Sequence, residues 1–216
     1  MVTSRQIDED LLYPSGDGKP MADNTEQYKW IVIIKENLEM LFANDNDVFI
    51  AGDLLWYPVR SKEVSPTAPD VMVVFGRPKG KRSSYRQWRE NNIPPQVVFE
   101  ILSPSNNDEE MKRKLELYEQ YGVDEYYIYD PQSQKTEAWM RGDEKLEQIE
   151  QVNGWLSPRL GIKFDTSQSE LVIYRPDGER FLTSVELRQG FEFQRQRAEK
   201  LAEYLRSQGI DPDNLP

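Results

Sequence analysis

The most constraining feature of the sequence is a short apolar segment that carries one acid. Residues 96–102, QVVFEIL, follow two prolines and predict a buried β-strand, and Glu100 lies inside it. The next stretch contains several helix-capping residues and predicts a helix over about residues 107–121, which Gly122 ends. A further strand is predicted at 124–131, DEYYIYDP. A carboxylate inside a buried strand is costly unless it is paired or binds a ligand, so Glu100 needs a partner.

The segments before this strand predict the rest of the architecture. Residues 23–43 begin with N-capping residues and continue with apolar residues at helical spacing, which predicts a helix. Residues 47–59 predict two strand segments around Gly52, and residues 69–76, PDVMVVFG, predict another strand. The order is therefore helix, three strands, helix and strand, which indicates an α/β fold.

The absence of two residue types limits the chemistry. The chain has no cysteine and no histidine, which excludes disulfides, thiolate nucleophiles, imidazole metal sites and Ser-His-Asp triads. An enzyme of this composition would act through Asp, Glu, Lys, Ser, Thr or Tyr, or through a hard metal ion held by oxygen ligands. No run approaches the roughly 18 apolar residues of a membrane span, and the N-terminal segment lacks the pattern of a secretory signal. We therefore expect a cytoplasmic protein with no membrane partner.

Asp70 and Glu100 are the candidate acid pair. Each lies in or next to an apolar strand, and the two strands are consecutive. Consecutive strands are neighbours in space about two-thirds of the time, so the two carboxylates could meet. Close carboxylates repel each other, and a divalent cation would relieve that cost. Alternatively, each acid pairs with a separate base, or Asp70 only caps a turn.

The helix predicted after Glu100 places a lysine on its apolar face. At about 100° per residue, Lys114 falls inside the apolar stripe that contains Met111 and Tyr118. An ammonium group beside an acid-bearing strand is expected to find a partner there. The alternative is a lysine that keeps its charge in solvent while its methylene groups pack.

An Asp, a Glu and a Lys on two strands and the following helix suit metal-assisted phosphodiester hydrolysis. The carboxylates would hold Mg²⁺ or Mn²⁺, which lowers the pKa of a bound water and neutralises charge on the phosphate. The lysine would orient the nucleophilic water or stabilise developing oxyanion charge. This chemistry needs no histidine, in agreement with the composition.

Three motifs carry a resemblance to a known family. They are PD at 69–70, VVFEILSPSN at 97–106 and KLELYEQYGVDEYYIYDP at 114–131. Over roughly residues 20–180 the chain resembles the bacterial Uma family of endonucleases, which belongs to the restriction-endonuclease-like PD-(D/E)XK superfamily. The resemblance implies an αβββαβ core with a mixed central sheet, a divalent metal cofactor and DNA as substrate.

The resemblance assigns roles position by position. Asp70 matches the acid of PD and Glu100 matches the second acid, so both are expected to be catalytic metal ligands. The superfamily motif has a lysine two residues after the second acid, where this chain has Leu102. The resemblance implies that Lys114 on the helix replaces it. The superfamily often adds a carboxylate from the first core helix; Glu26 is the candidate, and the alternative is an exposed glutamate stabilised by the helix dipole.

One segment of this acidic chain (net charge −11) is basic. Residues 77–89, RPKGKRSSYRQWR, contain no acid, and the candidate substrate-binding residues are Lys79, Lys81, Arg82, Tyr85, Arg86 and Trp88. The cations would clamp phosphates, and the aromatic residues would stack on a base or sugar. The alternative is a surface loop whose aromatic residues pack on the sheet edge.

Asp53, directly after Gly52, is a candidate for the rim of the site or a turn residue.

The last part of the chain changes character. Leu187, Phe191, Ala198, Leu201 and Leu205 form one helical stripe, so we expect a nuclease domain at residues 1–183 and a helical extension at 184–216. This helix could pair with a second copy as a homodimer or fold back on its own domain.

Three functions compete at this point. The first is a metal-dependent nuclease that acts on DNA. The second is a non-catalytic binding or regulatory module in which Asp70, Glu100 and Lys114 form a buried ion cluster, favoured by the acidic net charge and by Leu102. The third is another carboxylate enzyme, such as a retaining glycosidase, which needs a pair of acids but no inward lysine.

Overall fold

The computed structural model describes residues 9, 11–16, 18 and 20–214. The chain divides into two compact units, Met1–Phe181 and Leu182–Pro216. The first contains, in chain order, α2 (Thr25–Leu41), β1 (Val48–Gly52), β2 (Trp56–Tyr57), β3 (Val71–Phe75), β4 (Tyr85–Arg86), the 3₁₀ turn η1 (Gln87–Arg89), β5 (Val97–Ile101), α3 (Asp108–Gln120), β6 (Glu125–Asp130), β7 (Lys135–Arg141), β8 (Leu146–Gln148), β9 (Lys163–Asp165) and β10 (Val172–Tyr174). Of the helices within the described residues, none is long and apolar enough to cross a membrane.

The first unit is built on a mixed six-stranded sheet with the order β1-β3-β5-β6-β7-β8. Strand β3 is antiparallel to both β1 and β5. Strands β5 and β6 are parallel, and α3 connects them. Helix α2, strands β1, β3 and β5, helix α3 and strand β6 follow one another in the predicted αβββαβ order, with the short β2 and β4 inserted. The predicted α/β class is confirmed.

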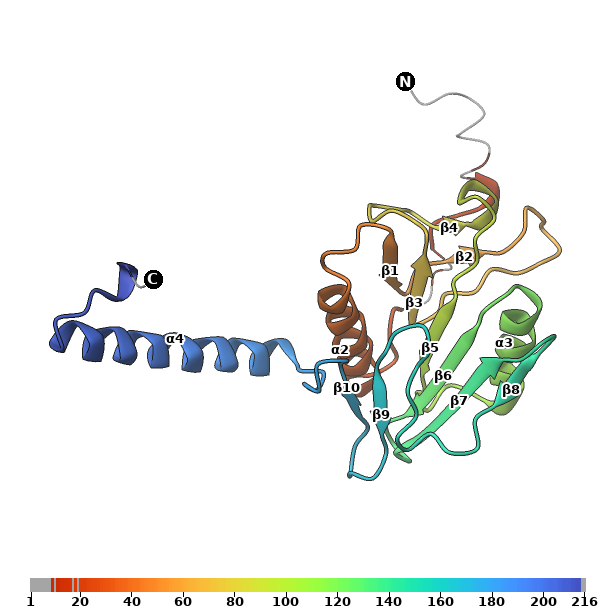
Figure 1. The fold of residues 1–216 in the computed structure, drawn as a ribbon. Helices are drawn as coiled ribbons and strands as arrows, with labels where there is room; N and C mark the ends of the chain where they lie inside the picture. The colour runs from red at the N-terminus through yellow and green to blue at the C-terminus, as the bar shows by residue number, and fades with distance from the viewer. Residues whose placement is uncertain (1–8, 10, 17, 19, 215–216) are drawn as a thin grey trace, which may run out of the picture. The chain divides into compact units, whose positions relative to one another are not determined.

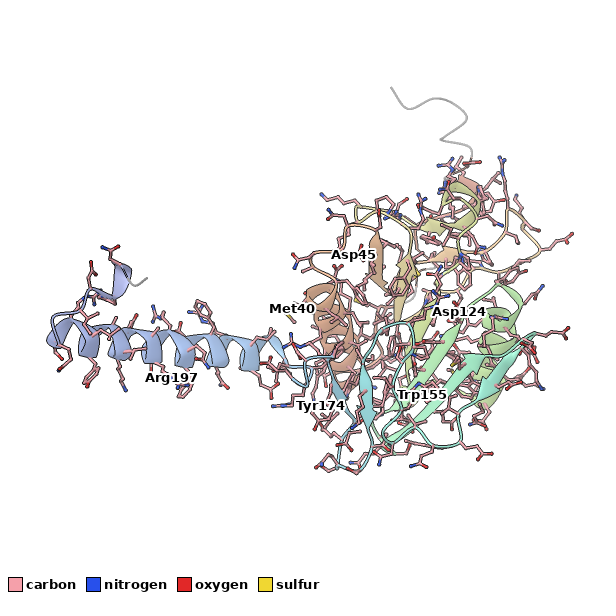
Figure 2. The ribbon with its side chains drawn as sticks, viewed as in Figure 1. Met40, Asp45, Asp124, Trp155, Tyr174 and Arg197 are labelled. Atoms are coloured by element: carbon pink, nitrogen blue, oxygen red, sulfur yellow. The ribbon has the colours of Figure 1, made fainter. Side chains whose placement is uncertain are left out.

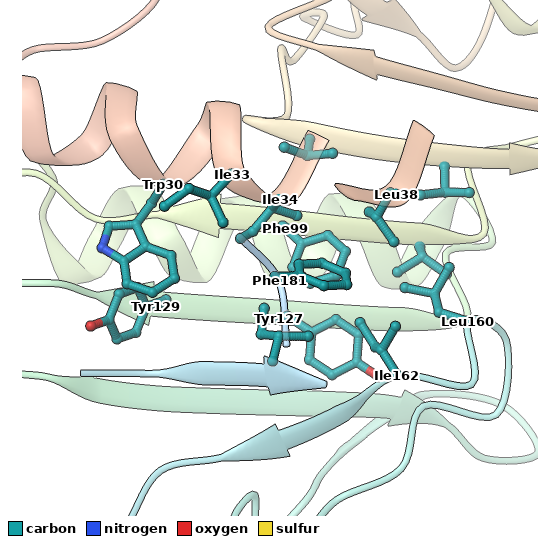
Figure 3. Packing of buried hydrophobic residues seen from close by; sticks show 14 of the residues in the cluster. Trp30, Ile33, Ile34, Leu38, Phe99, Tyr127, Tyr129, Leu160, Ile162 and Phe181 are labelled. Carbon is teal, nitrogen blue, oxygen red and sulfur yellow. The ribbon is translucent and has the colours of Figure 1, made fainter. Parts of the chain in front are cut away.

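Each face of the sheet is covered by one helix (Figure 1). On one face, Trp30, Ile34 and Leu38 of α2 pack against the sheet in a cluster that includes Phe99 and Tyr127 (Figure 3). On the other face, α3 contributes the buried Tyr118 and several partly buried residues to a second cluster. Because side chains alternate along a strand, neighbouring residues of β5 belong to different clusters.

The two core helices begin at the predicted capping residues. The Asn24 side chain accepts a hydrogen bond from the Gln27 N–H at 2.9 Å, and the Asn107 side chain accepts one from the Glu110 N–H at 2.9 Å. These bonds satisfy amide groups that have no partner inside the helix. Residue Gly122 follows α3 with a φ of +91°, which glycine adopts without the steric cost of a side chain.

A buried carboxylate anchors the segment after β8 to the sheet. The Oε2 atom of Glu125 accepts hydrogen bonds from the hydroxyls of Tyr127 at 2.9 Å and Ser157 at 2.5 Å. Its Oε1 atom accepts from the Arg159 N–H at 2.7 Å. The indole of Trp155, a residue labelled in Figure 2, donates to the Tyr127 hydroxyl at 3.1 Å and extends this network. Glu125 is thus held by neutral donors on the α2 side of the sheet.

The second unit consists of helix α4 (Ser184–Ser207) and a short 3₁₀ turn, η2 (Pro212–Asn214). Helix α4 starts with a capping box, in which the Thr183 hydroxyl accepts from the Glu186 N–H at 3.2 Å and the Glu186 carboxylate accepts from the Thr183 N–H at 2.9 Å. The pairs Arg188–Glu192 and Arg195–Glu192 lie along its surface at 2.6 and 2.9 Å. The predicted C-terminal helix is confirmed; its pairing in a homodimer stays a prediction.

Candidate active site

Asp70 and Glu100 lie on neighbouring antiparallel strands. Val71 of β3 pairs with Phe99 of β5, and the register continued by one residue places Asp70 opposite Glu100. Both acids share the α3 side of the sheet with Met72 and Val98, because side chains two residues apart point the same way. The main-chain N–H of Ile101 donates to Asp70 Oδ2 at 2.6 Å. The structure therefore brings the predicted acid pair together.

The pairing of two buried acids changes the proton affinity of Asp70. Burial raises the pKa of the Asp70 carboxyl from 3.8 to about 8, and the nearby Glu100 charge adds to this rise. The Ile101 N–H, the Lys114 charge and a hydrogen bond from Gln27 act in the opposite direction. The carboxyl is thus easily protonated when no cation neutralises the pair.

Lys114 reaches Glu100 from α3. Its Nζ atom lies 2.7 Å from Glu100 Oε2, a charge-assisted hydrogen bond. Burial lowers the pKa of Lys114, but the charge and hydrogen bond of Glu100 outweigh that effect, so the pKa is raised overall. Leu102, where the superfamily has lysine, packs against the α3-side core instead. The structure thus brings Asp70, Glu100 and Lys114 together despite the departure from the motif.

Tyr118, which the sequence placed on the apolar stripe of the helix as a packing residue, also contacts Glu100. Its hydroxyl donates to Glu100 Oε1, while its ring is fully buried and stacks on Trp56 at a centroid distance of 6.1 Å. Burial, followed by the Glu100 charge, raises the pKa of Tyr118 well above its ordinary value, which keeps the phenol a donor. Lys114 and Tyr118 are one helical turn apart, and together they engage both oxygens of Glu100.

A cavity of about 530 Å³ opens beside this group. Its charged and amide side chains are Asp23, Gln27, Asp53, Asp70, Asn106, Glu110 and Lys114. Lys114 is the only cationic side chain among the described residues that line it. Glu100 is 2 % exposed and is not among those residues, so of the Lys114–Glu100 pair only Lys114 lines the cavity.

The capacity for a metal rests on two carboxylates. Among the described residues, no group of three or more His, Cys, Asp or Glu side chains could hold an ion together. Magnesium is commonly bound through one or two carboxylates, with water and substrate phosphate as the remaining ligands. Asp70 and Glu100 provide that number of hard oxygen donors.

The first core helix contributes Gln27 to the site and not Glu26. Glu26 has a side chain 59 % exposed and pairs with Lys29 at 3.5 Å, so the prediction that it joins the metal ligands does not fit its position. Gln27 is buried, and its Nε2 atom donates to the Ile101 carbonyl at 2.9 Å. One residue corresponds to a rotation of about 100° around a helix, which is enough to exchange the solvent face for the site.

Sequence comparison assigns the family. The profile of the Uma2 family, described as "Putative restriction endonuclease", matches residues 20–169, more than half of the chain. The chain belongs to the Uma2 family. The family resemblance carried by the PD, FEILSPSN and KLELY motifs is thereby confirmed, and the family supports a restriction-endonuclease-like nuclease.

Solved and curated proteins add little to the Uma2 assignment. One crystal structure, of a "putative nuclease belonging to DUF820" from Anabaena variabilis, is 17 % identical in sequence. The similarity covers 70 % of this chain and 87 % of the other with a TM-score of 0.49, a likeness too weak to support an argument. No curated protein matches the chain.

In this Uma2 protein, cationic side chains of the basic segment make contacts inside the protein. Arg82 pairs with Glu90 at 2.8 Å and lies over the Phe49 ring, and Lys79 donates to the Phe42 carbonyl at 2.7 Å. Lys81 is exposed. The predicted phosphate clamp therefore does not fit Lys79 and Arg82, whose charges already have partners inside the protein.

The aromatic residues of the segment also have structural roles. Tyr85 is fully buried and donates to the Ile93 carbonyl at 2.7 Å, so the prediction that it stacks on a base does not fit. Trp88 packs against Tyr13 at a centroid distance of 4.8 Å. Arg86 is 5 % exposed and pairs with β2 through the main chain. None of the segment's residues lines the cavity beside Asp70.

Asp53 lies on the rim of the cavity, as one of its two interpretations required. Its backbone has a φ of +48°, and its N–H donates to the Asp70 carbonyl at 3.3 Å. The preceding Gly52 lies close to the same carbonyl, because a Cβ atom there would be 3.3 Å from its oxygen. This turn fixes the main chain of Asp70, and the side-chain role of Asp53 stays a prediction.

Proposed function

We propose that this protein is a divalent-metal-dependent endonuclease that hydrolyses DNA phosphodiester bonds, with Asp70, Glu100 and Lys114 as catalytic residues. The observation that carries the proposal is the 2.7 Å contact between Lys114 and Glu100, made on the strand position opposite Asp70. It supplies the cation that the superfamily motif places at the position of Leu102. Membership of the Uma2 family supports nucleic acid as the substrate.

The residues present fit Mg²⁺ or Mn²⁺. Asp70 and Glu100 are hard oxygen donors that repel each other in a buried place, and a divalent cation would remove that cost. A bound ion would supply charge neutralisation on the phosphate and a more acidic water. Asp70 and Glu100 would hold this ion, and Asp70 would have to lose its proton first because its pKa is about 8.

The remaining chemistry belongs to the side chains around Glu100. Lys114 is a cation on the cavity wall, so it can orient the attacking water or stabilise negative charge that develops on the phosphate. Tyr118 keeps the Glu100 carboxylate in one orientation through its hydroxyl. Gln27 holds both Asp70 and the Ile101 carbonyl, so α2 fixes the main chain next to the acids.

The proposal is tested by cleavage of supercoiled plasmid and labelled oligonucleotides. Wild-type protein is expected to nick or cut DNA with Mg²⁺ or Mn²⁺ and to lose this activity in chelator. The variants Glu100→Ala and Lys114→Ala are expected to lose most or all of this activity while they retain the circular dichroism spectrum of the wild type. Wild-type protein that cuts no form of DNA with either metal would refute the proposal.

The second candidate is a non-catalytic binding module on the same fold. The observation in its favour is that Lys114 and Tyr118 already engage both oxygens of Glu100, which makes a self-contained buried cluster. This candidate predicts that the protein binds DNA without cutting it and that Mn²⁺ changes neither binding nor melting temperature. The same plasmid and titration experiments therefore separate the two candidates.

A further inference from the structure

Three arginines converge on one carboxylate of the N-terminal segment. Arg60 Nη2 lies 2.8 Å from Glu9 Oε1, Arg89 pairs with Glu9 Oε2, and Arg86 Nη1 lies 4.0 Å from Glu9 Oε2. The Glu9 side chain is 11 % exposed, so its carboxylate is nearly buried. In the sequence, Glu9 is the middle residue of the acidic triplet Asp8-Glu9-Asp10.

The arrangement resembles the recognition of a phosphate. A guanidinium group binds carboxylate and phosphate oxygens with the same forked geometry, so a site that holds one can hold the other. Arg60 and Arg89 have side chains 56 % and 44 % exposed, which leaves their outer edges accessible to a ligand from solvent. The indole Nε1 of Trp88, next to Arg89 in the chain, is buried and has no acceptor among the described residues.

The N-terminal segment has a second anchor that does not involve Glu9. Tyr13 packs on Tyr57 and Trp88, and its carbonyl accepts a hydrogen bond from Arg86 Nη2 at 2.7 Å. The Tyr57 hydroxyl donates to the Pro14 carbonyl at 2.8 Å. The Glu9 carboxylate can therefore leave the arginines while residues 13 and 14 stay in place.

The arginine group is connected to the candidate active site through strand β2. Arg86 of β4 pairs with Tyr57 of β2, and the preceding Trp56 stacks on Tyr118, whose hydroxyl holds Glu100. Trp56 also bridges to Thr67, which lines the cavity. An anion bound to the arginines would therefore be linked, through β4 and β2, to Tyr118 and to Thr67 of the cavity lining.

We propose that Arg60, Arg86 and Arg89 form a binding site for the phosphates of a nucleic acid strand, which the Glu9 carboxylate occupies as an internal mimic in the free protein. The choice of nucleic acid rests on the proposed function. Glu9 competes because it is tethered close to the site, and a strand with several phosphates displaces it. The segment thereby weakens non-specific binding and releases the arginines only to a polyanion.

The test is oligonucleotide binding by fluorescence anisotropy in chelator, so that no cleavage is measured. Glu9→Gln is expected to bind about five- to tenfold more tightly than wild type, and its affinity should fall more steeply with salt, by about one unit in the log–log slope. Glu150→Gln removes the same charge at an exposed position away from the arginines and should leave binding nearly unchanged. Adding Arg89→Gln to Glu9→Gln should return the affinity to the wild-type value or below.

A purely structural role for Glu9 gives a different result. Glu9→Gln would then lower the melting temperature without tightening binding, which would overturn the inference. If Glu9→Gln does not fold, Arg60→Gln with Arg89→Gln provides the test: weaker binding and a flatter salt slope support the site, and unchanged values refute it. Binding in chelator can be present in a protein that cuts no DNA, so failure of the proposed nuclease activity is a separate result.

Discussion

Two glutamates are buried on neighbouring strands, Glu100 in β5 and Glu125 in β6, and both are at most 2 % exposed. Glu125 receives three hydrogen bonds from neutral donors, the hydroxyls of Tyr127 and Ser157 and the N–H of Arg159. Its neighbours across the sheet are apolar. Glu125 therefore resembles a structural carboxylate, paired so that its burial costs little.

Glu100 has a different environment. Its carboxylate accepts hydrogen bonds from the Lys114 ammonium group and the Tyr118 hydroxyl, and Asp70 lies opposite it. Like charges directly opposite each other on neighbouring strands are destabilising. Burial alone therefore does not distinguish the proposed metal ligand from a structural carboxylate, whereas the pairing with a second acid beside a cavity does.

The largest expected difference between the two glutamates is in catalysis. Glu100→Gln should reduce metal-dependent DNA cleavage by about 1,000-fold or more, because a metal ligand supplies several kcal/mol of transition-state stabilisation. Glu125→Gln should change the cleavage rate by less than about threefold. Rates of plasmid nicking under single-turnover conditions measure both, and equal losses in the two variants would remove the distinction.

Lys114 gives the next largest effect. Lys114→Met should lower the cleavage rate by about 100-fold, because it removes a positioned charge beside the phosphate. Lys112→Met removes the same charge from an exposed position of α3 and should stay within about twofold of wild type. A Lys114→Met variant with normal activity would show that the cation does not take part in the reaction.

The pH dependence of stability separates the acids in the absence of metal. The Asp70 pKa is raised from 3.8 to about 8 in the folded protein, so the folded state binds this proton more tightly than the unfolded state. The resulting stabilisation is fully present below pH 3.8 and is lost as pH rises to about 8, with a slope of at most about 1.4 kcal/mol per pH unit.

Urea unfolding in chelator between pH 5 and pH 9 measures this slope. Asp70→Asn should flatten the dependence, since the amide does not titrate. Glu125→Gln should keep the wild-type slope at a lower overall stability. A slope that is the same with and without Asp70 would place the titrating group elsewhere.

Glu125 is expected to matter for folding. Glu125→Gln replaces one acceptor oxygen with an amide that cannot accept from both hydroxyls and the Arg159 N–H, so the free energy of unfolding should fall by about 1–3 kcal/mol. Thermal and urea unfolding at one pH measure the loss. A variant as stable as wild type would show that the network around Glu125 contributes nothing.

The smallest effect is expected at Tyr118. Tyr118→Phe keeps the ring and removes only the hydroxyl that donates to Glu100, so the unfolding free energy should fall by about 1 kcal/mol. Tyr126→Phe, on a ring whose hydroxyl has no partner among the described residues, is the matched control and should not destabilise. Equal changes in the two variants would contradict the assigned contact.

The local sequence pattern was sufficient to predict the fold and the meeting of the two acids, Asp70 and Glu100. Helices α2 and α3 start at capping residues visible in the sequence, and the alternation of β3 and β5 places Asp70 and Glu100 on one face. The helical phase of α3 also predicted the inward direction of Lys114. The packing of Tyr118 was predicted, but its contact with Glu100 was not, because a hydroxyl at the end of a buried ring does not alter a hydrophobic pattern.

The basic segment shows where local pattern fails. Charge clustering along the chain does not reveal which acids pair with the cations. Here Glu90, directly after the segment, pairs with Arg82, and Glu9, from a distant part of the chain, pairs with Arg89. Likewise, Glu26 and Gln27 differ by one residue, which is below the precision with which a helix phase can be set from apolar residues. Tertiary contacts decided both outcomes.

The most direct test of the central claim is a calorimetric titration with Mn²⁺. Wild-type protein and Glu125→Gln should bind the ion, whereas Asp70→Asn and Glu100→Gln should show no measurable heat of binding. This result would establish that the two opposed acids form the metal site and that the other buried glutamate does not. Absence of binding by the wild type, or binding by all four proteins alike, would contradict the account.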